Sequence, residues 1–200
     1  MILGYRELVR AWETRKITFS PDIRPEQIGI SSIDLRLGYE VSKLQYREGI
    51  TVNPSLDEFD SRGLFTKDDY RKPDKLGRPR FLKIERNEFM VAFTLEQIHL
   101  PNNIAASVEG RSRLARYGLA VHTTAPHIDA AFVGQIALEL YNLGPLPIEL
   151  RPGIDRVCHL IFHEMKSAVP ESVAKSMGTF VRQKEPYQKP RSTHKSPHTV

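Results

Sequence analysis

The densest group of residues that could carry chemistry lies at positions 110–116. This heptapeptide reads GRSRLAR and holds three guanidinium groups and one hydroxyl. Guanidinium forks match the geometry of phosphate and carboxylate oxygens, and a turn entered through glycine can add backbone N–H donors. The segment is a candidate anion-binding turn, although a charged surface turn would have the same composition.

Glu139 is the candidate acid or base. Ile136, Leu138 and Leu140 alternate with Ala137 and Glu139, which is the period of a strand. We expect the three apolar side chains to face the core and Glu139 to face solvent or a cleft on the side of Ala137. A cleft would give this carboxylate a chemical role, whereas an exposed strand position would give it none.

A second carboxylate, Asp129, stands between Ile128 and the apolar run 130–132. An aspartate embedded among apolar residues needs a charged or hydrogen-bonding partner, or it has a functional task. We therefore count Asp129 among the candidate site residues.

The elements that must position these residues are mainly strands. From Phe81 onward, short apolar runs recur at intervals of about ten residues, and turn residues such as those at 101–103 and 152–153 separate them. This spacing is typical of an all-β sandwich, jelly roll or barrel. Strands do not alternate with helices, which disfavours a Rossmann or TIM-barrel fold.

The first 80 residues add three features. The apolar spacing over residues 4–16 predicts a short N-terminal helix. The sequence SSIDLRLG at 31–38 predicts a half-buried strand that ends at Gly38. Residues 54–80 are rich in charges, proline and glycine, and we expect a long surface excursion there with at most one short element.

Composition limits the class of protein. Of the 200 residues, 40% are hydrophobic, which suffices for a core without disulfides. The single cysteine, Cys158, suits a reducing compartment, so we expect a cytoplasmic protein. No apolar run approaches the roughly 20 residues of a membrane helix, so no membrane partner is expected.

The positive charge is concentrated at one end of the chain. The net charge is +5, and residues 182–200 carry five Lys or Arg against one Glu. The basic pI of about 9.3 therefore reflects a tail more than a basic face on the folded domain, and we expect no nucleic-acid partner.

Several motifs in the same order resemble the dCTP deaminase family, a branch of the trimeric dUTPase superfamily. They are SSIDLRLG at 31–38, TLEQIHLP at 94–101, VEGRSRLARYGLAVHTTA from residue 108, GQIALELYN at 134–142 and PIELRPG at 147–153. The resemblance implies a mainly β fold, a distorted β-barrel or jelly roll, which agrees with the strand pattern. It also implies a homotrimer with nucleotide sites at the subunit interfaces.

The resemblance assigns roles to individual residues. It implies that Glu139 is the catalytic acid/base, and that Ser112 and Arg116 position the attacking water and this carboxylate. Arg111 and Ser112 match a triphosphate-binding loop in which Arg113 replaces the family's second serine. Further positions match nucleotide contacts: Asp129 at the sugar 3′-hydroxyl, Ala137 and Leu138 at the base through their backbone, and Gln183 in a closing C-terminal segment.

Near the C-terminus the sequence departs from the family pattern. The family's phosphate-holding tyrosine and lysine correspond to Ser172 and Thr179 here. Arg113, Lys175, Arg182 or Lys184 are candidates to replace them. We expect a single β domain over residues 1–175 and a flexible basic lid or tail over 176–200.

The implied chemistry needs no resident metal. Zinc deaminases use an H-x-E…P-C-x-x-C signature, and a chain with one cysteine cannot supply it. We expect Mg²⁺ to bind through the triphosphate of the substrate, and no zinc.

Three functions are compatible with these residues. The first is a zinc-independent hydrolase that converts dCTP to dUTP and ammonia. The second is a dUTP diphosphatase, or a bifunctional enzyme that converts dCTP to dUMP and diphosphate. The third is a non-catalytic nucleotide sensor, and the joint presence of Ser112, Arg116, Asp129 and Glu139 argues against it.

Overall fold

The computed structural model describes residues 1–52 and 61–177. Within these residues strands are the main regular secondary structure, and no helix is long and apolar enough to cross a membrane. The strands are β1 (Thr18–Ser20), β2 (Ile33–Leu44), β3 (Phe65–Asp69), β4 (Leu82–Ile84), β5 (Phe89–His99), β6 (Ile104–Gly110), β7 (Leu119–Ala120), β8 (His127–Ile128), β9 (Val133–Asn142), β10 (Ile148–Leu150) and β11 (Arg156–Glu164). The helices are α1 (Tyr5–Glu13), η1 (Pro25–Gln27), η2 (Ser61–Leu64), α2 (Ser112–Ala115) and α3 (Glu171–Met177).

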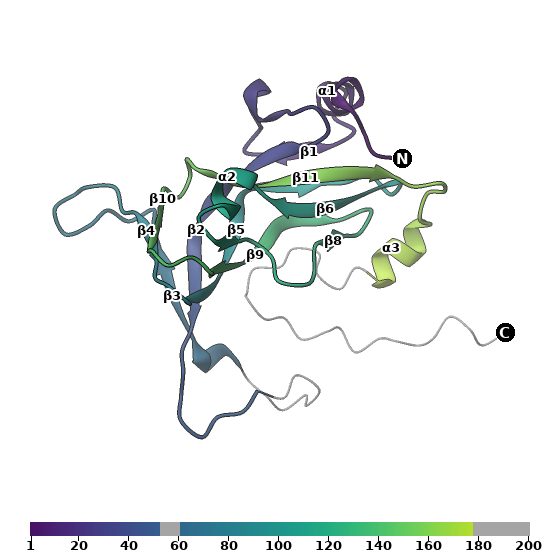
Figure 1. Cartoon of the computed structure of the whole chain (residues 1–200). Coiled ribbons are helices and arrows are strands. Elements are labelled where there is room, and N and C mark those ends of the chain that lie inside the picture. The colour runs from purple at the N-terminus through teal and green to yellow at the C-terminus, as the bar shows by residue number, and fades with distance from the viewer. Residues whose placement is uncertain (53–60, 178–200) are drawn as a thin grey trace.

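One large antiparallel sheet organises the described part of the molecule (Figure 1). Its strand order is β7-β9-β5-β2-β11-β6-β8, with β1 added to β5 and β3 added to β2. β10 and β4 form a separate two-stranded sheet. The sheet curls around a core of buried aliphatic side chains, so the predicted mainly β, barrel-like fold is confirmed.

The sheet bends where two pairs of strands lose register. β2 shifts against β5 between Leu37 and Val41, and β5 shifts against β9 between Phe93 and Gln97. Extra residues in one strand increase local bending and twist. At Gly38 an added Cβ would lie 2.7 Å from the carbonyl oxygen of Phe93, so this crossing of strands requires glycine. The bend curls the sheet around the core.

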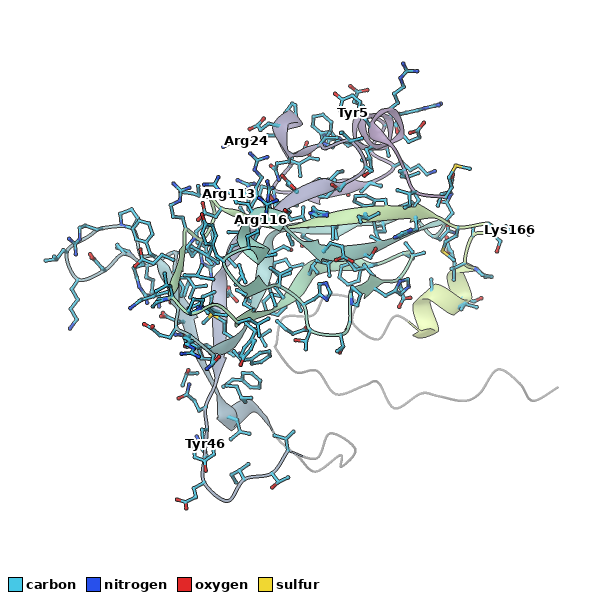
Figure 2. The ribbon with its side chains drawn as sticks, in the orientation of Figure 1. Tyr5, Arg24, Tyr46, Arg113, Arg116 and Lys166 are labelled. Atoms are coloured by element: carbon cyan, nitrogen blue, oxygen red, sulfur yellow. The ribbon has the colours of Figure 1, made fainter. Side chains whose placement is uncertain are left out.

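The N-terminal predictions hold with changed boundaries. The helix expected at 4–16 is α1, whose Leu8 and Ala11 are buried. The strand expected to end at Gly38 continues to Leu44, because the residues beyond the bulge pair with β3 and β5. The excursion at 54–80 contains β3, which pairs in register with the second half of β2. This pairing extends the sheet into an arm that carries Tyr46 near its tip (Figure 2).

Candidate active site

Glu139 lies on the outward face of β9, as the alternation predicts. Leu138 and Leu140 are fully buried, while Ala137 and Glu139 are half-buried on the opposite face. The Glu139 Oε2 atom accepts the backbone N–H of Thr123 at 3.0 Å. This bond fixes one carboxylate oxygen and gives the side chain a defined orientation.

One edge of β9 is open beside Glu139. β5 pairs with β9 from Val133 to Tyr141 on one edge, but β7 pairs only with Tyr141 and Asn142 on the other. Over 134–140 the described part of the chain places no strand on this second edge. An unpaired strand edge presents backbone donors and acceptors in fixed positions, which suits recognition of a planar, hydrogen-bonding ligand. Ala137 and Leu138 lie within this stretch.

Side-chain hydrogen bonds at the bulge of β5 hold the start of the open edge of β9. The Thr94 hydroxyl accepts the backbone N–H of Ile136 at 3.0 Å and donates to the Glu96 carbonyl at 2.8 Å. The Gln135 side chain donates to the Thr94 carbonyl at 2.7 Å. These bonds hold β9 in the two residues that precede Ala137.

Behind this bulge lies a buried ionic cluster that the sequence reasoning missed. The Glu96 side chain is completely buried, and its carboxylate accepts the Arg36 Nε at 2.7 Å and the Arg36 backbone N–H at 2.9 Å. Gln27 Nε2 donates to the same carboxylate at 3.1 Å. Three donors compensate the cost of burying this charge. The motifs SSIDLRLG and TLEQIHLP, which contain Arg36 and Glu96, were the only signal of it in the sequence.

The segment 111–116 is the second part of the candidate site. Arg111 caps the four-residue helix α2, in which no residue is buried. Ser112, Arg113 and Arg116 are exposed, and the structure gives their side chains no hydrogen-bond or ion-pair partner among the described residues. Figure 2 shows Arg113 and Arg116 on the surface at this helix. Their polar groups are free to bind a ligand.

Two anchors hold this exposed segment in place. At its start, the Arg111 guanidinium contacts the carboxylate of Asp34 on β2. At its end, Gly118 has a φ of +95° and its carbonyl accepts the N–H of Leu143 at 2.8 Å. A Cβ on Gly144 would collide with the Tyr117 carbonyl, so the chain after α2 passes directly against the end of β9.

Asp129 has apolar neighbours in the sequence but lies at the surface of the structure. Its side chain is 85% exposed and its closest charged partner is His127, whose Nε2 lies 3.3 Å from Oδ1. β8 ends at Ile128, whose side chain is buried, and the chain then turns outward; Ala131 adopts a left-handed φ of 64°. The turn, and not the apolar neighbours in sequence, decides the exposure of this carboxylate.

Comparison with known proteins agrees with the motif pattern. A model of the family described as dCTP deaminase-like matches residues 2–165. The chain belongs to the dCTP deaminase-like family. A relative from Methanosphaera stadtmanae, named "dCTP deaminase, dUMP-forming", is 36% identical over 83% of this chain and 80% of its own length. Another from Haloarcula marismortui, named "dCTP deaminase", is 33% identical over 84% of this chain and 82% of its own.

The fold agrees with a solved member of the family. The crystal structure of the 2′-deoxycytidine 5′-triphosphate deaminase from Agrobacterium tumefaciens superposes with a TM-score of 0.60 at 22% identity. The match covers 89% of this chain and 53% of that longer chain. The family assignment and the predicted fold are therefore confirmed.

The structure shows no bond between the family's candidate catalytic residues within the described part of one chain. In the described ranges, no hydrogen bond or ion pair joins Glu139 to Ser112 or Arg116. Gln183 and nearly all of the expected lid lie outside the described residues. Of the predicted site, the structure thus shows a strand part, with Ala137, Leu138 and Glu139, and a loop part, with Arg111–Arg116.

The histidines and the cysteine of the described ranges are possible metal ligands, but they do not cluster. His122 pairs with Glu109 at 3.6 Å, and His163 with the Ser107 hydroxyl at 2.9 Å. Burial raises the pKa of the Cys158 thiol far above its usual range, so it remains protonated. Among residues 1–52 and 61–177, no three His, Cys, Asp or Glu side chains are grouped to hold a metal ion. Independence from zinc remains a prediction.

Proposed function

We propose that the protein is an enzyme that hydrolytically deaminates dCTP. Water replaces the 4-amino group of the cytosine base, and ammonia leaves. Support comes from membership of the family and from relatives named dCTP deaminase that match more than four fifths of the chain. The retention of Glu139, Ser112, Arg116 and Asp129 favours an enzyme over a nucleotide sensor.

The observation that carries the proposal is the position of Glu139 beside the open edge of β9. A cytosine bound by backbone groups of Ala137 and Leu138 would place its reacting edge next to this carboxylate. Glu139 would take a proton from the attacking water and deliver it to N3. It would then take the proton of the new 4-hydroxyl group and pass it to the amine, which leaves as ammonia. The Thr123 N–H holds Oε2, which leaves Oε1 for this proton transfer.

The loop part of the site supplies positioning and charge. We assign Ser112 and Arg116 to the water and the carboxylate, and Arg111 and Arg113 to the phosphates, because guanidinium groups bind phosphate oxygens strongly. Exposed Asp129 is available to the sugar 3′-hydroxyl. Mg²⁺ enters with the substrate, bound mainly by phosphate oxygens. Gln183, which lies outside the described residues, is a further candidate nucleotide contact.

A homotrimer with interfacial sites would unite the two parts. Within the described chain no hydrogen bond or ion pair joins Glu139 to Ser112 or Arg116, and the polar side chains of α2 are exposed. A neighbouring subunit can supply the loop part to the strand part, as a closed cyclic assembly would allow.

Mixing inactive variants tests this shared site. Glu139→Gln and Arg116→Ala should each be inactive as pure proteins. Trimers co-expressed from both should regain activity, because some interfaces then combine one intact strand part with one intact loop part. Mixed trimers without activity, or a solution mass close to the 22.9 kDa monomer, would contradict the shared site.

A second candidate product is dUMP. Relatives from Methanosphaera stadtmanae and Thermobifida fusca, at 36% and 35% identity, are both named dUMP-forming. In that case a second water would attack the α-phosphate of the deaminated nucleotide, with diphosphate as the leaving group. Asp129, exposed and paired only with His127 in the described structure, is the candidate carboxylate for activating this water.

One assay separates the two products. The protein is incubated with Mg²⁺ and dCTP, and ammonia, dUTP, dUMP and diphosphate are measured over time. Equal amounts of ammonia and dUTP indicate a deaminase, and dUMP with diphosphate indicates the bifunctional enzyme. In the bifunctional case Asp129→Asn should accumulate dUTP. Absence of ammonia would reject the proposal.

A further inference from the structure

A second arginine shares the carboxylate that holds Arg111. Asp34 Oδ2 contacts Arg111 and also lies 3.3 Å from Nη1 of Arg156, the first residue of β11. Arg156 Nη1 additionally donates to the Glu26 carbonyl at 2.6 Å. The two guanidinium groups are therefore separated by no more than two hydrogen-bond lengths, although they come from segments 45 residues apart in the sequence.

Both arginines keep unused donors. Each is held through Nη1 alone, and the described residues provide no acceptor for Nε or Nη2 of either side chain. The Arg111 and Arg156 side chains are 30% and 36% exposed, so these donors are within reach of solvent. A guanidinium fixed at one nitrogen and free at the others is oriented for an external anion at little further cost in side-chain entropy.

Arg156 also lines a cavity with two more arginines. The cavity has a volume of about 200 Å³, and Arg24 and Arg36 face it together with Arg156. The Nε of Arg36 is bonded to buried Glu96, but its Nη atoms have no acceptor in the described structure. Glu26 is the acidic residue on the walls, 3.9 Å from Arg24. Figure 2 shows Arg24 at the same side of the molecule as Arg113 and Arg116.

The size and charge of this cavity define its ligand. Pockets for drug-sized molecules usually exceed about 300 Å³, so this cavity suits a small group and not a whole nucleoside. Glu26, Asp34 and Glu96 lie against the three guanidinium groups of the walls, but Arg36 and Arg156 keep donors without acceptors among the described residues. Such forked donors favour an anion with phosphate oxygens.

We propose that Arg156 binds the terminal phosphates of the nucleoside triphosphate, and that the phosphate site runs from Arg111 across Asp34 into the cavity lined by Arg24 and Arg36. This inference rests on the proposed function in taking a nucleoside triphosphate as the ligand. It adds a contact from β11, an element to which neither the family motifs nor the loop 111–116 gave a role in binding.

Direct binding measurements test the inference independently of catalysis. Inorganic triphosphate and dCMP are titrated into the full-length protein by calorimetry, for the wild type and for Arg156→Gln. The substitution should weaken inorganic triphosphate binding by about tenfold, the scale of one lost charge-assisted hydrogen-bonded contact, and leave dCMP binding unchanged. The KM for dCTP should rise in parallel while kcat changes little.

Arg151→Gln is the matched control. It makes the same change of charge five residues away, at an exposed arginine paired with Asp155 outside the cavity. It should retain the wild-type affinity for inorganic triphosphate. If Arg156→Gln and Arg151→Gln bound inorganic triphosphate with equal affinity, the inference would be overturned.

Two further variants keep the test decisive if Arg156→Gln folds poorly. Arg156→Lys retains the charge without the fork and should bind inorganic triphosphate with intermediate affinity. Glu26→Gln removes the acidic group from the cavity wall and should strengthen triphosphate binding; weaker or unchanged binding would count against the site. If the wild type does not deaminate dCTP yet these shifts occur, the anion site stands and the proposed function fails.

Discussion

The strand part and the loop part of the candidate site are built in opposite ways. Glu139 lies in a ten-residue strand whose alternate side chains are buried, and a hydrogen bond from Thr123 holds its carboxylate. Ser112 and Arg116 lie in or directly after a four-residue helix that has no fully buried residue, although Leu114 packs partly against the core. The first part is fixed by the core, and the second by anchors at its two ends, Arg111 with Asp34 and Gly118 against Gly144.

This difference separates two tasks. Proton transfer requires a group held within a fraction of an ångström, which a strand in a packed sheet provides. Binding of phosphates tolerates more movement, and a segment with few buried contacts can adjust to its ligand. We therefore expect changes in the strand part to alter kcat or stability. Changes that affect the phosphate-binding arginines of the loop part, Arg111 and Arg113, should mainly alter KM.

The largest effect is expected from Glu139→Gln. The substitution removes the proton carrier but nearly preserves shape, so deamination should fall by at least ~10²–10⁴-fold, the usual contribution of general acid–base catalysis. Nucleotide binding and the melting temperature should change little. Rates are measured by ammonia release, and binding by calorimetry. A variant that deaminates dCTP at the wild-type rate would exclude the mechanism, and loss of folding would show that Glu139 is structural.

The next largest effect is expected from the ionic cluster behind the strand part. Glu96→Gln would leave the largely buried Arg36 without its counter-charge, and should lower the free energy of unfolding by about 3 kcal/mol. Urea denaturation measures this. Glu40→Gln is the control, because the Glu40–Arg71 pair is exposed and should contribute less than about 1 kcal/mol. Similar losses in the two variants would show that burial of the cluster does not matter.

A smaller effect is expected where the loop part is anchored. An alanine at Gly144 would meet the Tyr117 carbonyl and displace the chain that follows α2. We expect a loss of ~1–3 kcal/mol in stability, as for other overpacked sites, and a KM for dCTP that rises more than kcat falls. Gly63→Ala, where the added methyl group meets no atom, should behave as the wild type. A fall in kcat alone would contradict the division of tasks.

The smallest effect is expected far from both parts, on the arm. Arg80 bonds to Asp68 at 2.8 Å and holds the pKa of Asp68 below its usual value. A lowered pKa stabilises the folded protein above the unfolded value of about 3.9, and this contribution is lost as the pH falls through the folded pKa. Asp68→Asn should cost less than about 1 kcal/mol at pH 7, because the pair is partly exposed.

The pH dependence of the stability difference between the wild type and Asp68→Asn tests this explanation. Urea denaturation of the wild type and Asp68→Asn should show a gap at pH 7 that narrows as the pH falls below about 4. A gap that is constant with pH would mean that the substitution acts through packing and not through charge. Activity should be unchanged, which would confirm that the arm is independent of both parts of the site.

Features that depend on local sequence patterns were predicted from the sequence. Alternation over 136–140 predicted correctly which face of β9 carries Glu139, because strand geometry alone decides it. The motif order identified the family, which the family model confirms. The exposure of Asp129 could not be predicted from the sequence, since it depends on a turn whose direction its apolar neighbours do not reveal.

Contacts between distant segments could not be predicted. Asp34 and Arg111 are 77 residues apart, and Gln27 and Glu96 are 69 apart. No periodicity relates such pairs, and their meeting depends on the strand order of the sheet. The same holds for β3, whose charged sequence is unlike a strand until its pairing with β2 supplies the partner.

The open edge of β9 has a consequence for handling the protein. A row of unsatisfied amides and carbonyls between buried aliphatic positions is a template for strand addition by another chain. In concentrated solution, ligand-free protein should be prone to slow edge-to-edge aggregation from this strand. A nucleotide that occupies the edge should lengthen storage life more than its effect on the melting temperature would suggest.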